Sequence, residues 1–155
     1  MVTSQDCINR FGTPINEQSS WESRNMALFQ LNPTIHLANG VIPSKIYCNK
    51  IFGKIIEAWL LALLEADVLK EIKTWDGCFN VRMKRGLRSL SLHAFGCAVD
   101  INASHNPLGL TAEDCRRRGL MPFSEKFIAT SRPFVDCGAD WKTRPDGMHF
   151  QIKNV

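Results

Sequence analysis

Two short segments of the sequence carry polar side chains whose types and spacing suit catalysis. One runs from Ser91 to Asp100 and contains His93, and the other runs from Asp146 to His149. Two imidazoles and one carboxylate are a common set of catalytic zinc ligands, because three protein ligands leave the fourth tetrahedral position open for water. Zinc lowers the pKa of that water to about 7, which makes hydroxide available at neutral pH. His93, Asp100 and His149 are therefore candidate ligands of a hydrolytic zinc site.

Asp146 is the candidate for the proton transfer that amide hydrolysis also requires. It precedes His149 by three residues, across a glycine, so its carboxylate can lie near the water of the proposed site. The other two histidines, His36 and His105, lie in segments without such partners, and we interpret them as structural or solvent-exposed.

Side-chain alternation along two expected strands places the candidate ligands on one face. In residues 97–102, Asp100 lies on the face opposite to the apolar positions; in residues 148–152, His149 and Gln151 do so. If the two strands are neighbours, Asp100 and His149 share a face of the sheet.

The remaining pattern predicts an α+β fold, a small antiparallel sheet with flanking helices. The clearest helix covers residues 50–72, where apolar residues recur every three or four positions in a stripe wide enough to pack against a sheet. Cap, turn and alternation signals predict helices near residues 3–12, 111–118 and 124–130, a strand at 78–83 and a loop at 16–25.

Length and composition favour a single domain spanning residues 1–155. Apolar residues make up 45% of the chain and charged residues 22%, which is ordinary for a globular protein. The longest apolar run, residues 58–64, is far shorter than the ~20 residues of a membrane span, so we expect no membrane insertion. The first ten residues lack the apolar core of a conventional signal peptide. We expect a monomer.

The net charge of +4 fits an acidic partner, but the basic clusters are short and lack interleaved aromatic residues, so we expect no nucleic-acid binding. The six cysteines are widely spaced and form no Cys-x-x-Cys pair. We interpret them as free, mostly buried thiols rather than as disulfides or metal ligands.

The residues around His93 resemble the SxHxxGxAxD signature of the LAS zinc peptidases, in the branch of VanY-like and L-alanyl-D-glutamate peptidases. The matching positions are Ser91, His93, Gly96, Ala98 and Asp100. Asp146 and His149 are similar to the second signature, in which an acid precedes the last zinc histidine by three residues. Residues 80–86 resemble the strand and loop that bear the family's substrate-binding arginine, and residues 138–142 resemble its Gly-x-x-Trp stretch.

This resemblance covers about residues 46–152 and implies a fold like that of the Hedgehog domain and the D-Ala-D-Ala peptidases, with residues 1–45 as an N-terminal helix and loop segment of the same domain. It implies that one zinc ion per chain is held by His93, Asp100 and His149, with Asp146 as general base and then general acid.

The resemblance also implies substrate contacts. Arg82 would hold a substrate carboxylate or polarise the scissile carbonyl, as a planar, charge-assisted donor. Ser91 would hydrogen-bond within the site or contact the substrate, and Trp141 is a candidate for lining the cleft, with simple packing as its alternative. Family members that cleave D-Ala-D-Ala commonly use glutamate as the base, whereas Asp146 is an aspartate, as in phage L-alanyl-D-glutamate endopeptidases.

The expected function is that of a zinc metallopeptidase that hydrolyses peptidoglycan stem peptides. We favour an L-alanyl-D-glutamate endopeptidase acting as a bacteriophage endolysin, a bacteriolytic enzyme made in the host cytoplasm and released to the cell wall by a holin. A D-alanyl-D-alanine carboxypeptidase is the alternative with the same chemistry. The alternative of another class is a non-catalytic, zinc-stabilised module that binds the cell wall or belongs to the virion.

Overall fold

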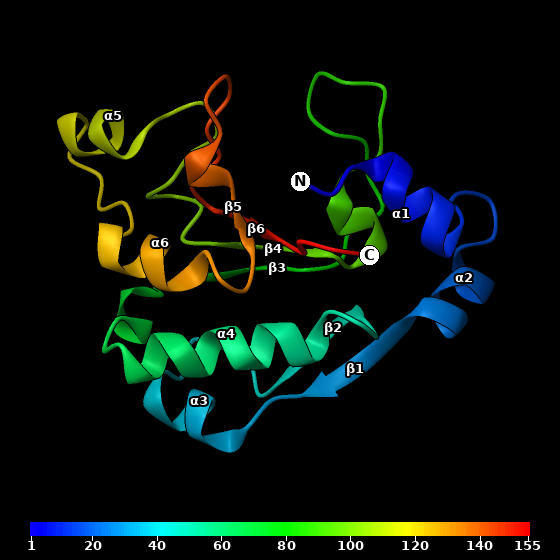
Figure 1. The fold of residues 1–155 in the computed structure, drawn as a ribbon, viewed down its shortest axis with the longest axis horizontal. Helices are drawn as coiled ribbons and strands as arrows, with labels where there is room; N and C mark the ends of the chain where they lie inside the picture. The colour runs from blue at the N-terminus through cyan, green and yellow to red at the C-terminus, as the bar shows by residue number, and fades with distance from the viewer.

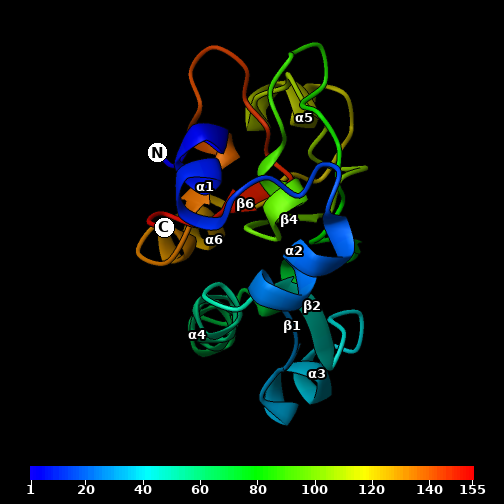
Figure 2. The same ribbon diagram turned by 90° about the vertical axis from the view of Figure 1, so that its right-hand side faces the viewer.

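The computed structural model describes all residues 1–155 and has the mixed architecture predicted for the chain (Figures 1 and 2). The helices are α1 (Ser4–Phe11), α2 (Gln18–Asn25), α3 (Pro33–Ala38), α4 (Gly53–Glu65), α5 (Ala112–Arg117) and α6 (Glu125–Ser131). The strands are β1 (Met26–Gln30), β2 (Lys45–Asn49), β3 (Trp75–Gly77), β4 (Ala98–Ile101), β5 (Asp136–Cys137) and β6 (His149–Gln151). Three short 3-10 helices are η1 (Leu69–Glu71), η2 (Leu92–Phe95) and η3 (Gly138–Asp140).

The centre of the molecule is a four-stranded antiparallel sheet in the order β3-β4-β6-β5. A separate antiparallel pair joins β1 to β2. In Figure 1, α4 runs beneath the four-stranded sheet, while α1, α5 and long loops lie above it. The α+β class and the antiparallel sheets are therefore confirmed.

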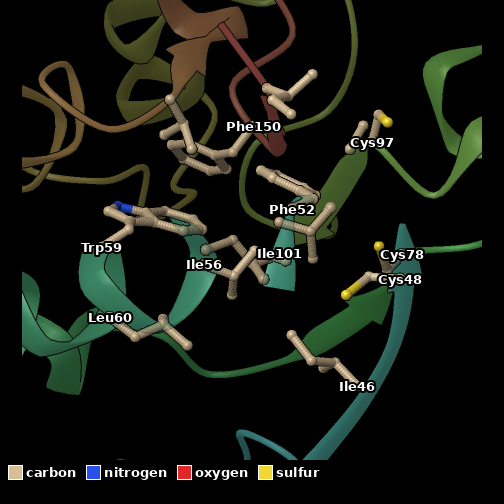
Figure 3. Packing of buried hydrophobic residues seen from close by; sticks show 14 of the residues in the cluster. Ile46, Cys48, Phe52, Ile56, Trp59, Leu60, Cys78, Cys97, Ile101 and Phe150 are labelled. Carbon is tan, nitrogen blue, oxygen red and sulfur yellow. The ribbon is translucent and has the colours of Figure 1, made fainter. Parts of the chain in front are cut away.

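The apolar face of the sheet packs on α4 and α6. Trp59 of α4 packs against Phe150 of β6, with ring centroids 4.9 Å apart (Figure 3). Phe127 of α6 packs against both rings. Val99 and Ile101 of β4 are fully buried in the same cluster. Burying each such side chain contributes about 1.5–3 kcal/mol, so this face anchors the strands whose other face carries the polar residues.

The caps of three predicted helices are confirmed. Thr3 and Asp6 form a reciprocal capping box at the start of α1, and Thr111 and Asp114 form another at α5. Ser124 caps α6 by accepting a hydrogen bond from a backbone amide in its first turn. These side chains satisfy amide groups that a helix N-terminus leaves without partners.

Three expected elements differ in the structure. The predicted helix at 50–72 is shorter, because Asp67 adopts a positive φ of 57° after α4 and the chain continues into η1. The predicted strand at 78–83 is wrong: strand β3 ends at Gly77, and only an isolated bridge pairs Met83 with Leu90. An apolar pattern indicates which residues suit a strand, but it does not show whether a neighbouring strand is present to form the backbone hydrogen bonds.

The predicted loop at 16–25 is also wrong, because residues 18–25 form α2. This helix has no apolar stripe and is held mainly through Trp21, which is 1% exposed. The indole N–H of Trp21 donates to the backbone carbonyl of Phe11 at 2.9 Å. A single anchoring side chain leaves no periodic signal in the sequence.

All six cysteine side chains are buried and present as free thiols. Burial raises the pKa of the Cys48 and Cys137 thiols to about 12, which keeps them protonated at neutral pH. No helix combines the length and the apolar character needed to cross a bilayer.

Replacing Gly96 by alanine is expected to lower the free energy of unfolding by about 2–4 kcal/mol. Gly96 follows η2 with a φ of 64°, and a Cβ there would lie 2.5 Å from Cε of Met26 and 2.7 Å from the backbone nitrogen of Asn49. Gly40→Ala is the matched control, since nothing lies within 4 Å of its added Cβ. Urea denaturation measures both variants; equal stabilities would refute the packing argument.

Candidate metal centre

Strands β4 and β6 bring Asp100 and His149 together. The two residues are paired directly across the antiparallel ladder. Because side chains alternate along a strand, their neighbours Val99 and Phe150 point into the core while Asp100 and His149 share the other face. The shared face predicted from alternation is confirmed.

His93 reaches this face from η2, the short 3-10 helix that precedes β4. The Ser91 hydroxyl accepts a hydrogen bond from the backbone N–H of His93 and so caps η2. Gly96 then turns the chain back into β4 in the left-handed conformation that glycine tolerates best. The His93 side chain is thereby held in a fixed position, and the residue is only 3% exposed.

Three side-chain atoms meet at one point above the sheet. Nε2 of His93 lies 3.2 Å from Nδ1 of His149, and both nitrogens lie 3.1 Å from Oδ1 of Asp100. These three residues form a group of the kind that could hold a metal ion. The structure thus brings together residues separated by 56 positions in the chain.

The outer nitrogens of both imidazoles face oxygen atoms that accept hydrogen bonds. Nδ1 of His93 lies 2.9 Å from the backbone carbonyl oxygen of Cys78, which can only accept. Nδ1 therefore carries the proton in the neutral ring, and Nε2 presents a lone pair. Nε2 of His149 lies 3.1 Å from Oε1 of Gln151, so Nδ1 is the atom of that ring left for a metal.

The donor set fits a zinc ion. With both outer nitrogens protonated, two imidazole lone pairs and a carboxylate oxygen point at one another with no proton between them, an arrangement that a cation relieves. Zinc bonds of about 2.0–2.1 Å at tetrahedral angles would place ligand atoms about 3.3 Å apart. The observed separations of 3.1–3.2 Å are close to this spacing.

The Asp100 carboxylate is electrostatically tied to the two imidazoles. Burial alone would raise its pKa. Without a metal, a protonated imidazole of His149 or His93 donates to this carboxylate, and these contacts outweigh burial and hold the pKa well below its usual value. Nη2 of Arg82 adds a cation 4.0 Å from Oδ2 of the same carboxylate. Asp100 is therefore ionised at neutral pH, as a metal ligand must be.

Asp146 lies in the turn before β6, beside the convergent atoms. Its backbone N–H donates to the carbonyl of Gly138 at 2.9 Å, and its carbonyl accepts from the N–H of His149 at 3.0 Å. A Cβ at position 138 would collide with the Asp146 carbonyl oxygen, so this close approach requires glycine. The small residue in η3 thus helps to set the position of Asp146.

One carboxylate oxygen of Asp146 makes no hydrogen bond within the protein. This atom, Oδ1, is buried. Burial raises the pKa of this carboxyl, which makes it a better proton acceptor than an exposed aspartate. A buried, unpartnered carboxylate oxygen beside a candidate metal site is an arrangement suited to general base catalysis.

The remaining predicted site residues line a cleft of about 590 Å³ that opens over the candidate metal site. Arg82, Ser91 and Trp141 all contribute to its wall. Trp141 packs against the ring of His149 with centroids 5.3 Å apart, and its indole N–H is buried without a partner. Ser91 also has the structural role of capping η2. His36 and His105 lie away from the cleft lining.

The cleft is rich in cationic side chains. Its basic residues are Arg82, Lys84, Arg85, Lys142 and Arg144. Among its acidic residues, Asp140 is already paired with Arg132 through two hydrogen bonds. The guanidinium of Arg144 donates to the backbone carbonyl of Arg85 at 2.9 Å, which links the two loops that overhang the cleft. This charge favours a substrate that carries carboxylates.

Sequence reasoning assigned no role to three features of the site. They are the Cys78 carbonyl, the amide of Gln151 and residues Met1–Thr3, which line one side of the cleft. Alternation already placed Gln151 on the face of His149, so that one signal was present in the sequence. The Cys78 carbonyl and residues 1–3 had no such signal, because neither a backbone carbonyl nor a segment far away in the chain forms a sequence motif with the site residues.

Part of the second half of the chain matches a known protein family. Residues 85–152 match the family model described as D-alanyl-D-alanine carboxypeptidase. This stretch, less than half of the chain, is similar to that peptidase family. It contains His93, Asp100 and His149 together with Asp146, and it begins just after Arg82. No curated protein and no solved structure gives a significant match.

Substituting alanine for His93 or His149 is expected to abolish stoichiometric zinc binding, because two remaining ligands hold zinc weakly. Metal analysis by mass spectrometry after dialysis measures the zinc bound per chain. His36→Ala is the matched control; its imidazole contacts the Ile42 carbonyl in the β1–β2 region and should leave zinc unchanged. Full zinc occupancy in both cleft variants would exclude these residues as ligands.

Proposed function

We propose that this protein is a zinc-dependent peptidase that hydrolyses peptide bonds in peptidoglycan stem peptides. The observation that carries the proposal is the convergence of His93, Asp100 and His149 beside the unpartnered carboxylate of Asp146. The family match of residues 85–152 supports the same class of reaction. The cationic cleft supports an acidic peptide as the substrate.

His93, Asp100 and His149 would hold the zinc ion. In such a site zinc supplies Lewis acidity and lowers the pKa of water toward neutrality. Asp146 would accept the proton of the attacking water through its free Oδ1 and then deliver it to the nitrogen of the leaving amine. Because the amine departs with this proton, the carboxylate is restored at the end of each turnover.

Arg82 and Trp141 would position the substrate. The Arg82 guanidinium lies beside Asp100 at the edge of the cleft and can form paired hydrogen bonds with a carboxylate or with the scissile carbonyl. Trp141 has a buried indole N–H without a partner, which can donate to a peptide carbonyl. The loops that bear Arg85 and Arg144 would approach further carboxylates of the peptide.

Two scissile bonds remain as candidates. The family match favours release of a C-terminal D-alanine, as its description states for the family. The aspartate at position 146 favours cleavage between L-alanine and D-glutamate, by the resemblance of this acid to that of phage endopeptidases. In the second case the protein would serve as an endolysin that a holin releases from the host cytoplasm to the cell wall.

Digestion of purified peptidoglycan with the zinc-loaded protein tests the function directly. We expect cleavage that a chelator stops and added zinc restores. Mass spectrometry of the fragments separates the candidates: free D-alanine indicates the carboxypeptidase, and new L-alanine carboxyl ends indicate the endopeptidase. Zinc binding and wall binding without any cleavage would contradict the proposal and would indicate a non-catalytic wall-binding module.

Asp146→Asn is expected to retain zinc and to lower kcat about 10²–10⁴-fold, because the amide is unable to accept the proton of water. Turnover of a soluble stem peptide and metal content are measured on the same sample. Asp136→Asn is the matched control, since Asp136 also has a buried oxygen without a partner but lies outside the cleft. A near-normal kcat for Asp146→Asn would remove this residue as the base.

A further inference from the structure

The side chain of Gln151 connects the candidate metal centre to the N-terminal segment. Its Oε1 lies 3.1 Å from Nε2 of His149, and its Nε2 donates to the backbone carbonyl of Val2 at 3.0 Å. Gln151 is 3% exposed and Val2 is 8% exposed, so both contacts are shielded from bulk water. The amide therefore bridges His149, near the C-terminus, and Val2, near the N-terminus.

The chemistry of the three groups determines where the protons lie. A backbone carbonyl only accepts hydrogen bonds, so the NH₂ end of Gln151 must face Val2 and its oxygen must face His149. This oxygen also only accepts, so Nε2 of His149 carries the proton of the neutral ring. Nδ1 is left with a lone pair directed toward Asp100 and His93. The carbonyl of residue 2 thus specifies the tautomer of His149 through one glutamine.

The sheet leaves space for this bridge. Gln151 lies two residues beyond His149 on the same face of β6, and its partner across the ladder is Ala98, whose small side chain is fully buried. The N-terminus lies close to the C-terminal strand in both ribbon views (Figures 1 and 2). The long side chain of Gln151 therefore spans the space between β6 and the N-terminal segment.

A second contact holds the N-terminal segment without Gln151. The hydroxyl of Ser4, a residue 6% exposed, donates to the backbone carbonyl of Leu90, in the loop that leads to η2. Val2 and Thr3 also line the cleft beside His149. The segment is thus attached at two points and forms part of the cleft wall.

We infer that Gln151 is a positioning residue that sets the tautomer and ring orientation of His149, and that docking of residues 2–4 is thereby coupled to metal affinity. The inference rests on the zinc site of the proposed function. Partners of metal-bound histidines of this kind typically change metal affinity about 10–100-fold when they are removed. Because coupling is reciprocal, bound zinc should in turn stabilise the docked N-terminal segment.

Two substitutions at position 151 test separately the contact of Gln151 with His149 and its hydrogen bond to Val2. Gln151→Met has similar length but no polar atoms to hold His149, and it should raise the Kd for zinc about 10–100-fold in competition with a chromophoric chelator. Gln151→Glu keeps an oxygen that accepts from His149, so its Kd should rise only severalfold, as in Ser4→Ala, and stay well below that of Gln151→Met. The same glutamate is unable to donate to Val2, so amide hydrogen exchange in residues 3–7 should be faster than in the wild type.

Ser4→Ala tests the coupling without altering any group near the metal. It removes the contact with Leu90, so it should raise the Kd for zinc severalfold in the wild-type background and have no further effect in Gln151→Met. Thr130→Ala is the control. Thr130 also donates its hydroxyl to a backbone carbonyl, that of Lys126, but lies in α6 away from the cleft. Its Kd for zinc should remain that of the wild type.

The outcomes distinguish this inference from the proposed function. Zinc binding by the wild type with an unchanged Kd in folded Gln151→Met would overturn the inference and leave the peptidase proposal intact. If that variant fails to fold by circular dichroism, an unchanged Kd in Ser4→Ala, or an equal loss of affinity in Ser4→Ala and Thr130→Ala, would overturn it instead. A wild-type protein without zinc affinity would overturn both.

Discussion

The structure depends on a local arrangement that is unfavourable by itself. Two imidazole nitrogens and a carboxylate oxygen meet within 3.2 Å of one another, while the opposite nitrogen of each ring faces an oxygen that only accepts hydrogen bonds. Burial strengthens the repulsion between lone pairs, because little water is present to screen it. A divalent cation, or a proton on one ring, relieves it. The surrounding fold therefore preorganises these three groups to bind a cation.

The apolar layer beneath the sheet supplies the rigidity that this arrangement needs. Below the sheet, Trp59 of α4 packs on Phe150 of β6 with the two ring planes tilted by 35°, while His149 of β6 points the opposite way. The antiparallel register places Asp100 directly across from His149, and a slip of either strand by one residue would turn its polar side chain toward the core. Packing energy on one face of the sheet thus maintains chemical geometry on the other.

The part of the site that could be predicted from sequence is the part encoded by local pattern. Alternation identified the strands that carry Asp100 and His149, and short-range spacing identified Asp146. Helix caps were predicted for the same reason, since a cap such as Thr111 acts within one turn. Features that depend on distant partners were missed. Residues 78–83 form no strand because no neighbouring strand pairs with them beyond one isolated bridge at Met83. The hydrogen bond from Gln151 to Val2 joins residues at the two ends of the chain, so no local pattern predicts it.

The most direct test of the account is the X-ray absorption spectrum of zinc bound to the protein. Six buried thiols offer zinc an alternative to the His93, Asp100 and His149 group, so the type of donor atom decides between them. We expect a first shell of nitrogen and oxygen at about 2.0–2.1 Å, with the outer-ring scattering of two imidazoles. A sulfur shell at about 2.3 Å, or the absence of imidazole scattering, would contradict the account.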